Sequence, residues 1–467
     1  YRRRERPRLR GWESATIRCN PCGAASNRGY NRLAGKALVM AFELDSRVLT
    51  LALARMVDAV ANSFLVVVLP LYIGQVVALP AVVGEAVTVG GLSFTLTEEL
   101  LIGIVLSLFG FLNSLGQPFT GRLSDRTGKR KVYILLGLAL VAVGSVGFLF
   151  LADYVSVLVL RAFQGIGAAF TVPMTVALVN EYSAAGERGG NFGLFNTFRL
   201  LGFGTGPLVA GVVLNFGPYP LPGVTLSGFD AAFLVAVVGA VASFGLVTLL
   251  ISDPESVEAQ AGEDLSIAMR NRDGPGLDPV FALGLATIVM AMSFAIFAPL
   301  ANTINARLGQ GELLFSVEFG AAVLANVLFQ LPIGRLSDRY GRRPFLLFGF
   351  VLLLPTTLLQ GIVTTPGAMI ALRFLQGLSV AAVFAPSLAL AGELAGAGES
   401  GSTLSILTMG FGLGIAFGTL LSGILVGFGF AVPFVVATVG GAVGLGLVYT
   451  QVPETNAAGS AAVSPGD

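Results

Sequence analysis

The chain has 467 residues, of which 12% are charged and 54% hydrophobic, and its net charge is +1. Soluble globular proteins carry about 25% charged residues. The composition therefore excludes a soluble fold, and it also excludes a disordered chain, a disulfide-rich secreted domain and a nucleic-acid-binding domain, because each needs many polar, Cys or basic residues. With a mean hydropathy of +0.82, the sequence predicts a polytopic membrane protein.

The first 39 residues differ from the rest. They hold ten Lys or Arg and two Glu, a net charge of +8, without the apolar run that a secretory signal needs. Because the chain opens on Tyr1 and Met40 follows, we expect residues 1–39 to be a basic leader, disordered or non-native; the alternative is an arm that contacts anionic lipid. Cys19 and Cys22 form one C-x-x-C pair, and with no His in the chain we expect no metal and no cofactor.

Twelve apolar stretches from Met40 onward are long enough to cross a hydrocarbon core of about 30 Å. Their length and lack of alternation predict helices rather than barrel strands, and so an all-α membrane protein. The predicted spans are residues 48–75, 99–120, 131–151, 155–179, 190–213, 230–251, 279–300, 312–333, 344–363, 367–390, 402–427 and 429–451.

The polar segments between spans predict the domains and the orientation. We expect a first six-helix bundle over 40–251, a cytoplasmic linker over 252–278, a second six-helix bundle over 279–451 and a disordered cytoplasmic tail over 452–467. Nine basic residues follow the second and eighth spans, whereas the opposite connections hold little beyond Arg307. The positive-inside rule then predicts that both termini lie in the cytoplasm, and we expect the membrane to be the plasma membrane.

An internal repeat relates the two bundles. Residues Gln117 to Arg130 read QPFTGRLSDRTGKR, and residues Gln330 to Arg343, 213 positions later, read QLPIGRLSDRYGRR. Arg161 with Gln164 likewise recurs as Arg373 with Gln376. Six spans per copy is an even number, so both copies cross in the same direction, as in transporters built from parallel repeats.

These motifs resemble those of the major facilitator superfamily. The two GRLSD runs are similar to its signature after the second span, and the fifth-span glycines with Pro207 resemble the motif of its drug:proton antiporters, except that Ala210 stands where Gly is usual. The resemblance implies a major facilitator fold of twelve helices and, for the fifth span, a bend that limits leakage. The residues concerned are Gly193, Gly202, Gly206, Pro207 and Gly211.

Both copies of the loop motif hold glycines, an Asp and basic residues. The glycines permit a tight reversal between helices, and the Asp can face the positive end of a neighbouring helix. Positive-inside anchoring alone would explain the basic residues but not the Asp in both copies, so we predict a conformational latch, a charge contact made in one of two states. Its residues are Gly121, Asp125, Arg126, Gly128, Arg130, Gly334, Asp338, Arg339, Gly341 and Arg342.

Small residues dominate the fifth span. Gly202, Gly206 and Gly211 leave a groove for another helix, and Pro207 removes one backbone hydrogen bond. Ordinary small-residue packing is the alternative explanation. The second copy has Thr419 in place of Pro207, which favours a specific role for the proline in one repeat.

Charged side chains in the first and fifth spans are the strongest candidates for function, because such a group costs about 2.5–3.5 kcal/mol at the bilayer centre. Asp58 lies about 15 Å into the first span and resembles the first-span acid of tetracycline-type exporters. Arg55 precedes it by one turn, so the two form either a proton-coupling site or a static neutral pair. Arg199 needs a buried anion, for which Asp58 is the candidate.

The fourth, eighth and tenth spans hold further candidates. Arg161 and its copy Arg373 either tune a nearby carboxylate or extend to the outer interface. Glu318 either takes part in transport or faces the aqueous opening. Asn113 and its copy Asn326, like Gln117 and Gln330, are expected to hydrogen-bond between helices.

The resulting functional prediction is a secondary transporter, not an enzyme, that exports small amphipathic molecules coupled to protons, with alternating access of the two bundles. The alternatives are a symporter or uniporter that imports a sugar or organic acid, and a non-transporting sensor or scaffold. We expect a monomer whose partners are a small-molecule substrate, protons and membrane lipid, with no nucleic acid.

Overall fold

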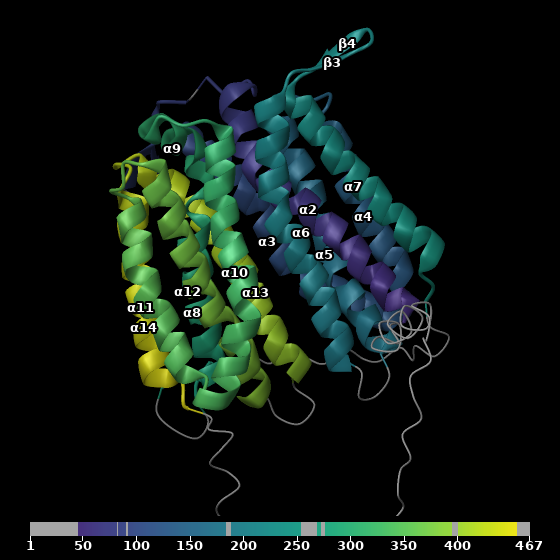
Figure 1. Cartoon of the computed structure of the whole chain (residues 1–467), viewed down its shortest axis with the longest axis vertical. Helices are drawn as coiled ribbons and strands as arrows, with labels where there is room; N and C mark the ends of the chain where they lie inside the picture. The colour runs from purple at the N-terminus through teal and green to yellow at the C-terminus, as the bar shows by residue number, and fades with distance from the viewer. Residues whose placement is uncertain are drawn as a thin grey trace, which may run out of the picture. The chain divides into compact units, whose positions relative to one another are not determined.

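The computed structural model describes residues 45–81, 83–89, 92–183, 188–253, 269–271, 276–394 and 400–454. Within these ranges, twelve helical segments are long and apolar enough to cross a membrane (Figure 1). The predicted fold class, twelve helices in two repeats, is confirmed. The basic leader with Cys19 and Cys22, most of the predicted linker and the tail from 455 onward lie outside the described residues.

The two repeats follow one another along the chain. The first contains α2 (Ser46–Gln75), α3 (Glu98–Thr127), α4 (Arg130–Gly147), α5 (Tyr154–Tyr182), α6 (Arg188–Phe216) and α7 (Gly228–Leu250). The second contains α8 (Pro279–Ala295), the 3₁₀ turn η1 (Ala298–Leu300), α9 (Ala301–Leu308), α10 (Glu312–Tyr340), α11 (Arg343–Gln360), α12 (Pro366–Leu394), α13 (Ser400–Val426) and α14 (Val432–Gln451). The predicted seventh span, residues 279–300, thus ends at η1, where Pro299 cannot donate a backbone hydrogen bond, and α9 extends the helical segment to Leu308.

Helices α3 and α10 are longer than the apolar spans that predicted them. They continue to Thr127 and Tyr340, because hydropathy marks the apolar part of a helix and not its polar extension. The prediction that Gly121 helps to reverse the chain is therefore wrong, since Gly121 and its copy Gly334 both lie inside these helices. The chain turns one residue after each helix, at Gly128 and Gly341, where φ is +67° and +95° and glycine is favoured.

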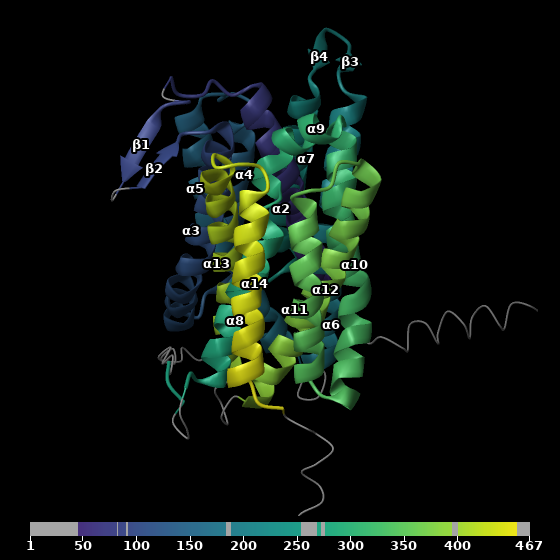
Figure 2. The same ribbon diagram turned by 90° about the vertical axis from the view of Figure 1, so that its left-hand side faces the viewer.

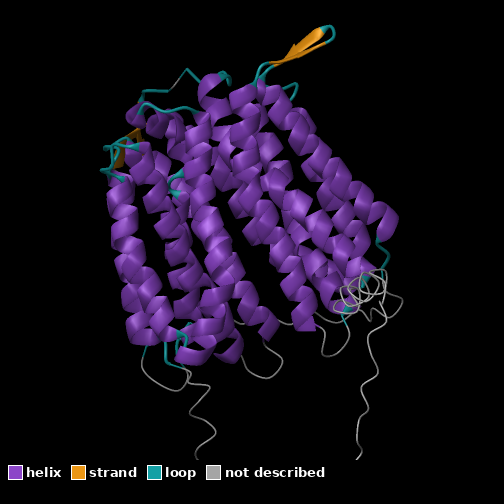
Figure 3. Ribbon diagram, in the orientation of Figure 1, coloured by secondary structure: helices purple, strands orange, loops and turns teal. Residues whose placement is uncertain are grey.

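Two short antiparallel hairpins were not anticipated by the search for apolar spans. One pairs β1 (Ala86–Val89) with β2 (Leu92–Thr95), and the other pairs β3 (Tyr219–Leu221) with β4 (Val224–Leu226). Both lie at the same end of the helices (Figures 2 and 3). We call this the hairpin end, and we call the opposite end, with the turns at Gly128 and Gly341, the basic-loop end.

The same helix pairs pack together in both repeats. Helix α2 packs on α6 and α7 as α8 packs on α13 and α14, and α5 contacts α3 and α4 as α12 contacts α10 and α11. Between the repeats, α3 packs on α13 and α6 packs on α10. The fold therefore brings the second and fifth helices of each repeat against the other repeat.

Candidate functional site

The glycines of α6 allow close approach of two different helices. A Cβ at Gly206 would lie 2.7 Å from the carbonyl oxygen of Val60 on α2, and one at Gly211 would lie 2.5 Å from Cβ of Ser316 on α10. Gly202 meets the Met56 carbonyl oxygen in the same way, whereas Gly193 has open space around it. The motif thus joins α6 both to its own repeat and to the other one.

The second repeat has the same close packing at the copied glycines. A Cβ at Gly414 would meet the backbone of Ile288 on α8, and one at Gly418 would lie 2.9 Å from Cα of Met292. These contacts match those of Gly202 and Gly206 with α2. Pro207 lies inside α6, while Thr419 of α13 donates to the Ile415 carbonyl oxygen over 3.1 Å.

Three charged side chains lie near the middle of α2 and α6. Arg55 and Asp58 form an ion pair on α2, with 15% and 14% of their side chains exposed. Arg199 donates from Nε and Nη2 to Oδ1 of Asn196, over 3.0 and 2.8 Å. The expected Arg199–Asp58 pair is therefore not formed, and Arg199 instead lies within electrostatic range of the like charge on Arg55.

The contacts of α6 show in which direction the Arg199 side chain points. At 100° per residue, Arg199 and Asn196 lie between the Gly202 face, which packs on α2, and the Gly211 face, which packs on α10. The exposed side chain of Leu201 lies on the opposite side. Arg199 consequently faces the interior between the two repeats rather than the outside of the bundle.

Arg161 is buried and does not extend to an interface, so that alternative is wrong. Its side chain is 1% exposed, donates to Gln164 Oε1 over 2.9 Å and lies 4.5 Å from the centre of the Phe109 ring. Gln164 in turn donates to the Ser145 hydroxyl over 3.1 Å. These contacts tie α5 to α3 and α4.

Arg373 repeats this arrangement and adds a carboxylate. It is fully buried, donates to Gln376, and lies 4.2 Å from the centre of the Phe297 ring. Glu318 interacts with the Gln310 side chain and, electrostatically, with Arg373. Because Glu318 is 0% exposed, the alternative that it faces the aqueous opening is wrong.

The repeated Asn–Gln pairs differ between the two copies. On α3, Gln117 donates to Asn113 Oδ1 over 3.1 Å, so this hydrogen bond lies within one helix and not between helices as predicted. On α10, the buried Oδ1 of Asn326 and Oε1 of Gln330 have no hydrogen-bond partner among the described residues. Two acceptors are therefore available on α10.

Some residues of the predicted latch take part in a charge cluster, one in each repeat. Arg130 donates to Asp125 over 2.5 Å and to Glu181 of α5 over 3.1 Å. In the second repeat Arg342 pairs with Asp338 and, over 2.9 Å, with Glu393 of α12. Burial lowers the pKa of Arg342, but the hydrogen bonds to Glu393 and Asp338 outweigh it and raise that pKa above its usual value.

Two charged residues of the predicted latch lie outside the charge clusters, and two members of the clusters were not predicted. Arg126 and Arg339 are exposed. Sequence reasoning missed Glu181 and Glu393, although they lie 212 residues apart, which matches the spacing of the repeat and could have revealed them.

Acidic residues after the sixth helix of each repeat cap the third helix. Asp253, which follows α7, accepts from the backbone N–H of Lys131 over 2.7 Å. Glu454, which follows α14, accepts from the backbone N–H of Arg342 over 2.9 Å. Both carboxylates thus lie at a helix N-terminus, where negative charge is stabilising.

The two repeats are joined by polar contacts at the hairpin end. Asn302 of α9 donates to Glu98 Oε1 over 2.7 Å, Thr303 donates to Glu99, and Gln75 donates to Glu312 over 3.2 Å. Closer to the middle of the helices, a Cβ at Gly412 of α13 would lie 3.3 Å from Cβ of Ser114 on α3.

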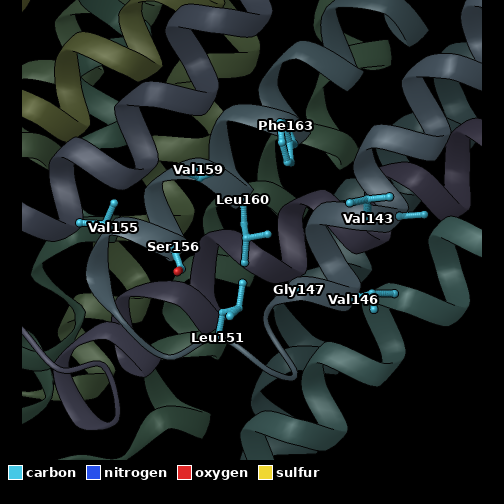
Figure 4. Close-up of a pocket in the computed structure, with 10 residues that line it drawn as sticks. Val143, Val146, Gly147, Leu151, Val155, Ser156, Val159, Leu160 and Phe163 are labelled. Atoms are coloured by element: carbon cyan, nitrogen blue, oxygen red, sulfur yellow. The ribbon is translucent and has the colours of Figure 1, made fainter.

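An apolar pocket of about 630 Å³ lies between α4 and α5 (Figure 4). Its lining includes exposed Val143, Val155 and Val159. Ser156 is its polar side chain, and that hydroxyl already donates to Asp153 over 2.5 Å. The pocket therefore suits lipid chains better than a polar ligand. Among the residues that the structure describes, no group of three or more Cys, Asp or Glu could hold a metal ion.

The sequence matches the family model of the Major Facilitator Superfamily over residues 51–272 and 283–465. The chain belongs to this superfamily. An uncharacterized MFS-type transporter of Methanocaldococcus jannaschii is 24% identical over 52% of this chain and 61% of its own length. The vesicular acetylcholine transporter of Torpedo marmorata is 29% identical over 34% of this chain and 31% of its own length. The matches thus span less than two thirds of these relatives.

Two further similarities show how varied the superfamily is. Citrate exporter 1 of Aspergillus niger is 26% identical over 35% of this chain and 28% of its own length. Among solved structures, a bacterial homologue of the human lysosomal transporter Spinster, inward-facing and occupied, superposes with a TM-score of 0.68 at 12% identity, over 92% of this chain and 97% of that one. This likeness shows the fold, while the relatives differ in what they carry.

Proposed function

We propose that this protein is a proton-coupled secondary transporter that exports small amphipathic molecules across the plasma membrane, with both termini cytoplasmic. The observation that carries the proposal is the Arg55–Asp58 ion pair, which lies within electrostatic range of the interior-facing Arg199. A charged carboxylate at this depth has a high insertion free energy, so its presence indicates a function. It can bind and release a proton when its ion pair opens.

We propose that the substrate crosses the membrane by alternating access, in which the two repeats move against each other. The contacts at Asn302, Gln75 and Gly412 close the hairpin end and the middle of the repeats. The charge clusters of Arg130 and Arg342 each stay within one repeat. We propose that the protein is here open toward the basic-loop end, and that rocking of the repeats breaks the hairpin-end contacts while loading and release alternate.

Transport by purified protein in proteoliposomes tests the coupling. A thermal-shift screen against cationic dyes, sugars and organic acids first identifies compounds that bind. Their movement is then followed under an imposed pH gradient, in either direction, for wild type, Asp58→Asn and the control Glu85→Gln, an exposed acid outside the spans. We expect gradient-driven export to be lost in Asp58→Asn alone. Undiminished transport by Asp58→Asn would overturn the assignment, and import driven by an inward proton gradient would favour symport.

A further inference from the structure

The charges inside the membrane-spanning helices are unequal between the repeats. At this depth the first repeat holds Arg55, Arg161 and Arg199 against the single acid Asp58. The second holds Arg373 with Glu318 as its electrostatic partner, and so is neutral. The first repeat therefore carries two cations without a carboxylate partner. Unpaired charges in a region of low dielectric are destabilising unless another group compensates them.

Arg161 and Arg199 differ in their access to a ligand. Arg161 is 1% exposed and lies among Gln164 and the Phe109 ring. Arg199 is partly exposed, and its hydrogen-bond partner is a neutral amide. Arg55 is also partly exposed and adds a like charge nearby. Arg199, supported by Arg55, is therefore the cation that a ligand between the repeats can reach.

The second repeat contributes neutral and aromatic groups. Phe384 of α12 and Phe411 of α13 are partly exposed, and their ring centres lie 5.0 Å apart. Phe411 neighbours Gly412, which touches Ser114 of the first repeat. The second repeat thus offers an apolar surface near the interface, while the first offers a net positive one.

We propose that the transported compound is a small amphipathic organic anion, whose acidic group binds Arg199 and Arg55 and whose apolar part lies against the second repeat. The substrate class rests on the proposed transport function, but the binding site does not. Two Arg and one Asp sum to +1, so a monoanion neutralises the site while Asp58 is ionised. Asp58 and the anion compete for Arg55, because one guanidinium cannot be fully paired with both. Loss of the Asp58 charge therefore favours anion binding, so for an anion the pH-gradient experiment is expected to show substrate and proton moving in the same direction, as in the symport alternative, rather than in exchange.

Three probes of similar size and different charge test this assignment. They are p-toluenesulfonate, p-toluenesulfonamide and benzyltrimethylammonium, whose charges do not change near neutral pH. Binding to the purified full chain is measured by calorimetry and thermal shift in gluconate buffer, with sodium chloride as a separate arm. We expect p-toluenesulfonate alone to bind, and Arg199→Gln to weaken its binding about tenfold or more. The control Arg122→Gln, an exposed residue, should bind like wild type.

An increase in affinity provides the second test, since misfolding cannot produce it. Asp58→Asn removes the competing carboxylate, so we expect it to bind p-toluenesulfonate more tightly even though proton coupling is lost. The proposal is overturned if p-toluenesulfonate does not bind, if benzyltrimethylammonium binds instead, if Arg199→Gln binds like wild type, or if chloride binds equally well and displaces the sulfonate. None of these results decides whether Asp58 couples transport to protons. Conversely, undiminished transport by Asp58→Asn would not exclude anion binding at Arg199.

Discussion

The guanidinium of Arg342 donates to Glu393 over 2.9 Å and so ties the start of α11 to the end of α12. Arg130 makes the equivalent bond to Glu181. The next residue, Arg343, points elsewhere: it donates to the carbonyl oxygen of Tyr449 over 2.5 Å. One of two adjacent arginines therefore completes the charge cluster of the second repeat.

Arg342→Gln should destabilise the protein more than Arg335→Gln. The first change removes two ion pairs from a partly buried side chain, at a cost of about 1–2 kcal/mol, whereas Arg335 is exposed. Unfolding of both variants in mixed micelles, followed by circular dichroism, measures the difference. Equal midpoints for the two variants would show that the cluster adds nothing to stability.

Gly206→Ala should lower stability by about 1–3 kcal/mol, because the new methyl group would meet backbone atoms of α2 that cannot move aside. Gly193→Ala belongs to the same motif but has open space, so it should leave the midpoint nearly unchanged. Thermal unfolding of the two variants tests the packing role. If both behave alike, the motif acts in another way.

Arg373→Met should cost about 3–5 kcal/mol, because it leaves the buried Glu318 without its electrostatic partner. The double variant Arg373→Met/Glu318→Gln should recover part of this loss. A double-mutant cycle on unfolding free energies measures the coupling. Purely additive losses would mean that the two charges do not interact.

A disulfide between Ser114→Cys and Gly412→Cys should form readily when Cys19 and Cys22 are replaced. A Cβ at Gly412 would lie 3.3 Å from Cβ of Ser114, close to the spacing of about 3.8 Å in disulfides. Because the bond would hold α3 against α13, oxidation should stop transport and reduction should restore it. Each single-Cys variant serves as a control. Transport that continues after complete cross-linking would exclude rocking at this contact.

The sequence predicted the helices well because each one spans an apolar core of fixed thickness. It could not predict where α3 and α10 end, since their last turns are polar. Nor could it predict α9, because Asn302, Asn305 and Arg307 make this continuation of the seventh span polar. The hairpins are too short for a hydropathy pattern to detect.

The sequence identified the candidate charged residues, but it did not show which of them contact one another. The pairing of Arg55 with Asp58 could be predicted because the two residues lie three positions apart on one helix. The partner of Arg199 could not be predicted. Asn196, one turn away, competes with Asp58 on another helix, and the packing of the helices decides between them. The repeat offset of 213 pairs Arg130 with Arg343, yet Arg342 makes the bond that is equivalent to that of Arg130. The turns at Gly128 and Gly341 have different backbone conformations, which the sequence repeat does not show.

The capping carboxylates of Asp253 and Glu454 bear on how the protein can be engineered. Each accepts a hydrogen bond from a backbone N–H at the start of the third helix of its own repeat. An affinity tag or fluorescent fusion attached after Glu454 preserves the cap, whereas a truncation that removes Glu454 leaves the backbone N–H of Arg342, the N-cap residue of α11, without this acceptor. Expression screens of C-terminally shortened chains should therefore keep this residue as their boundary.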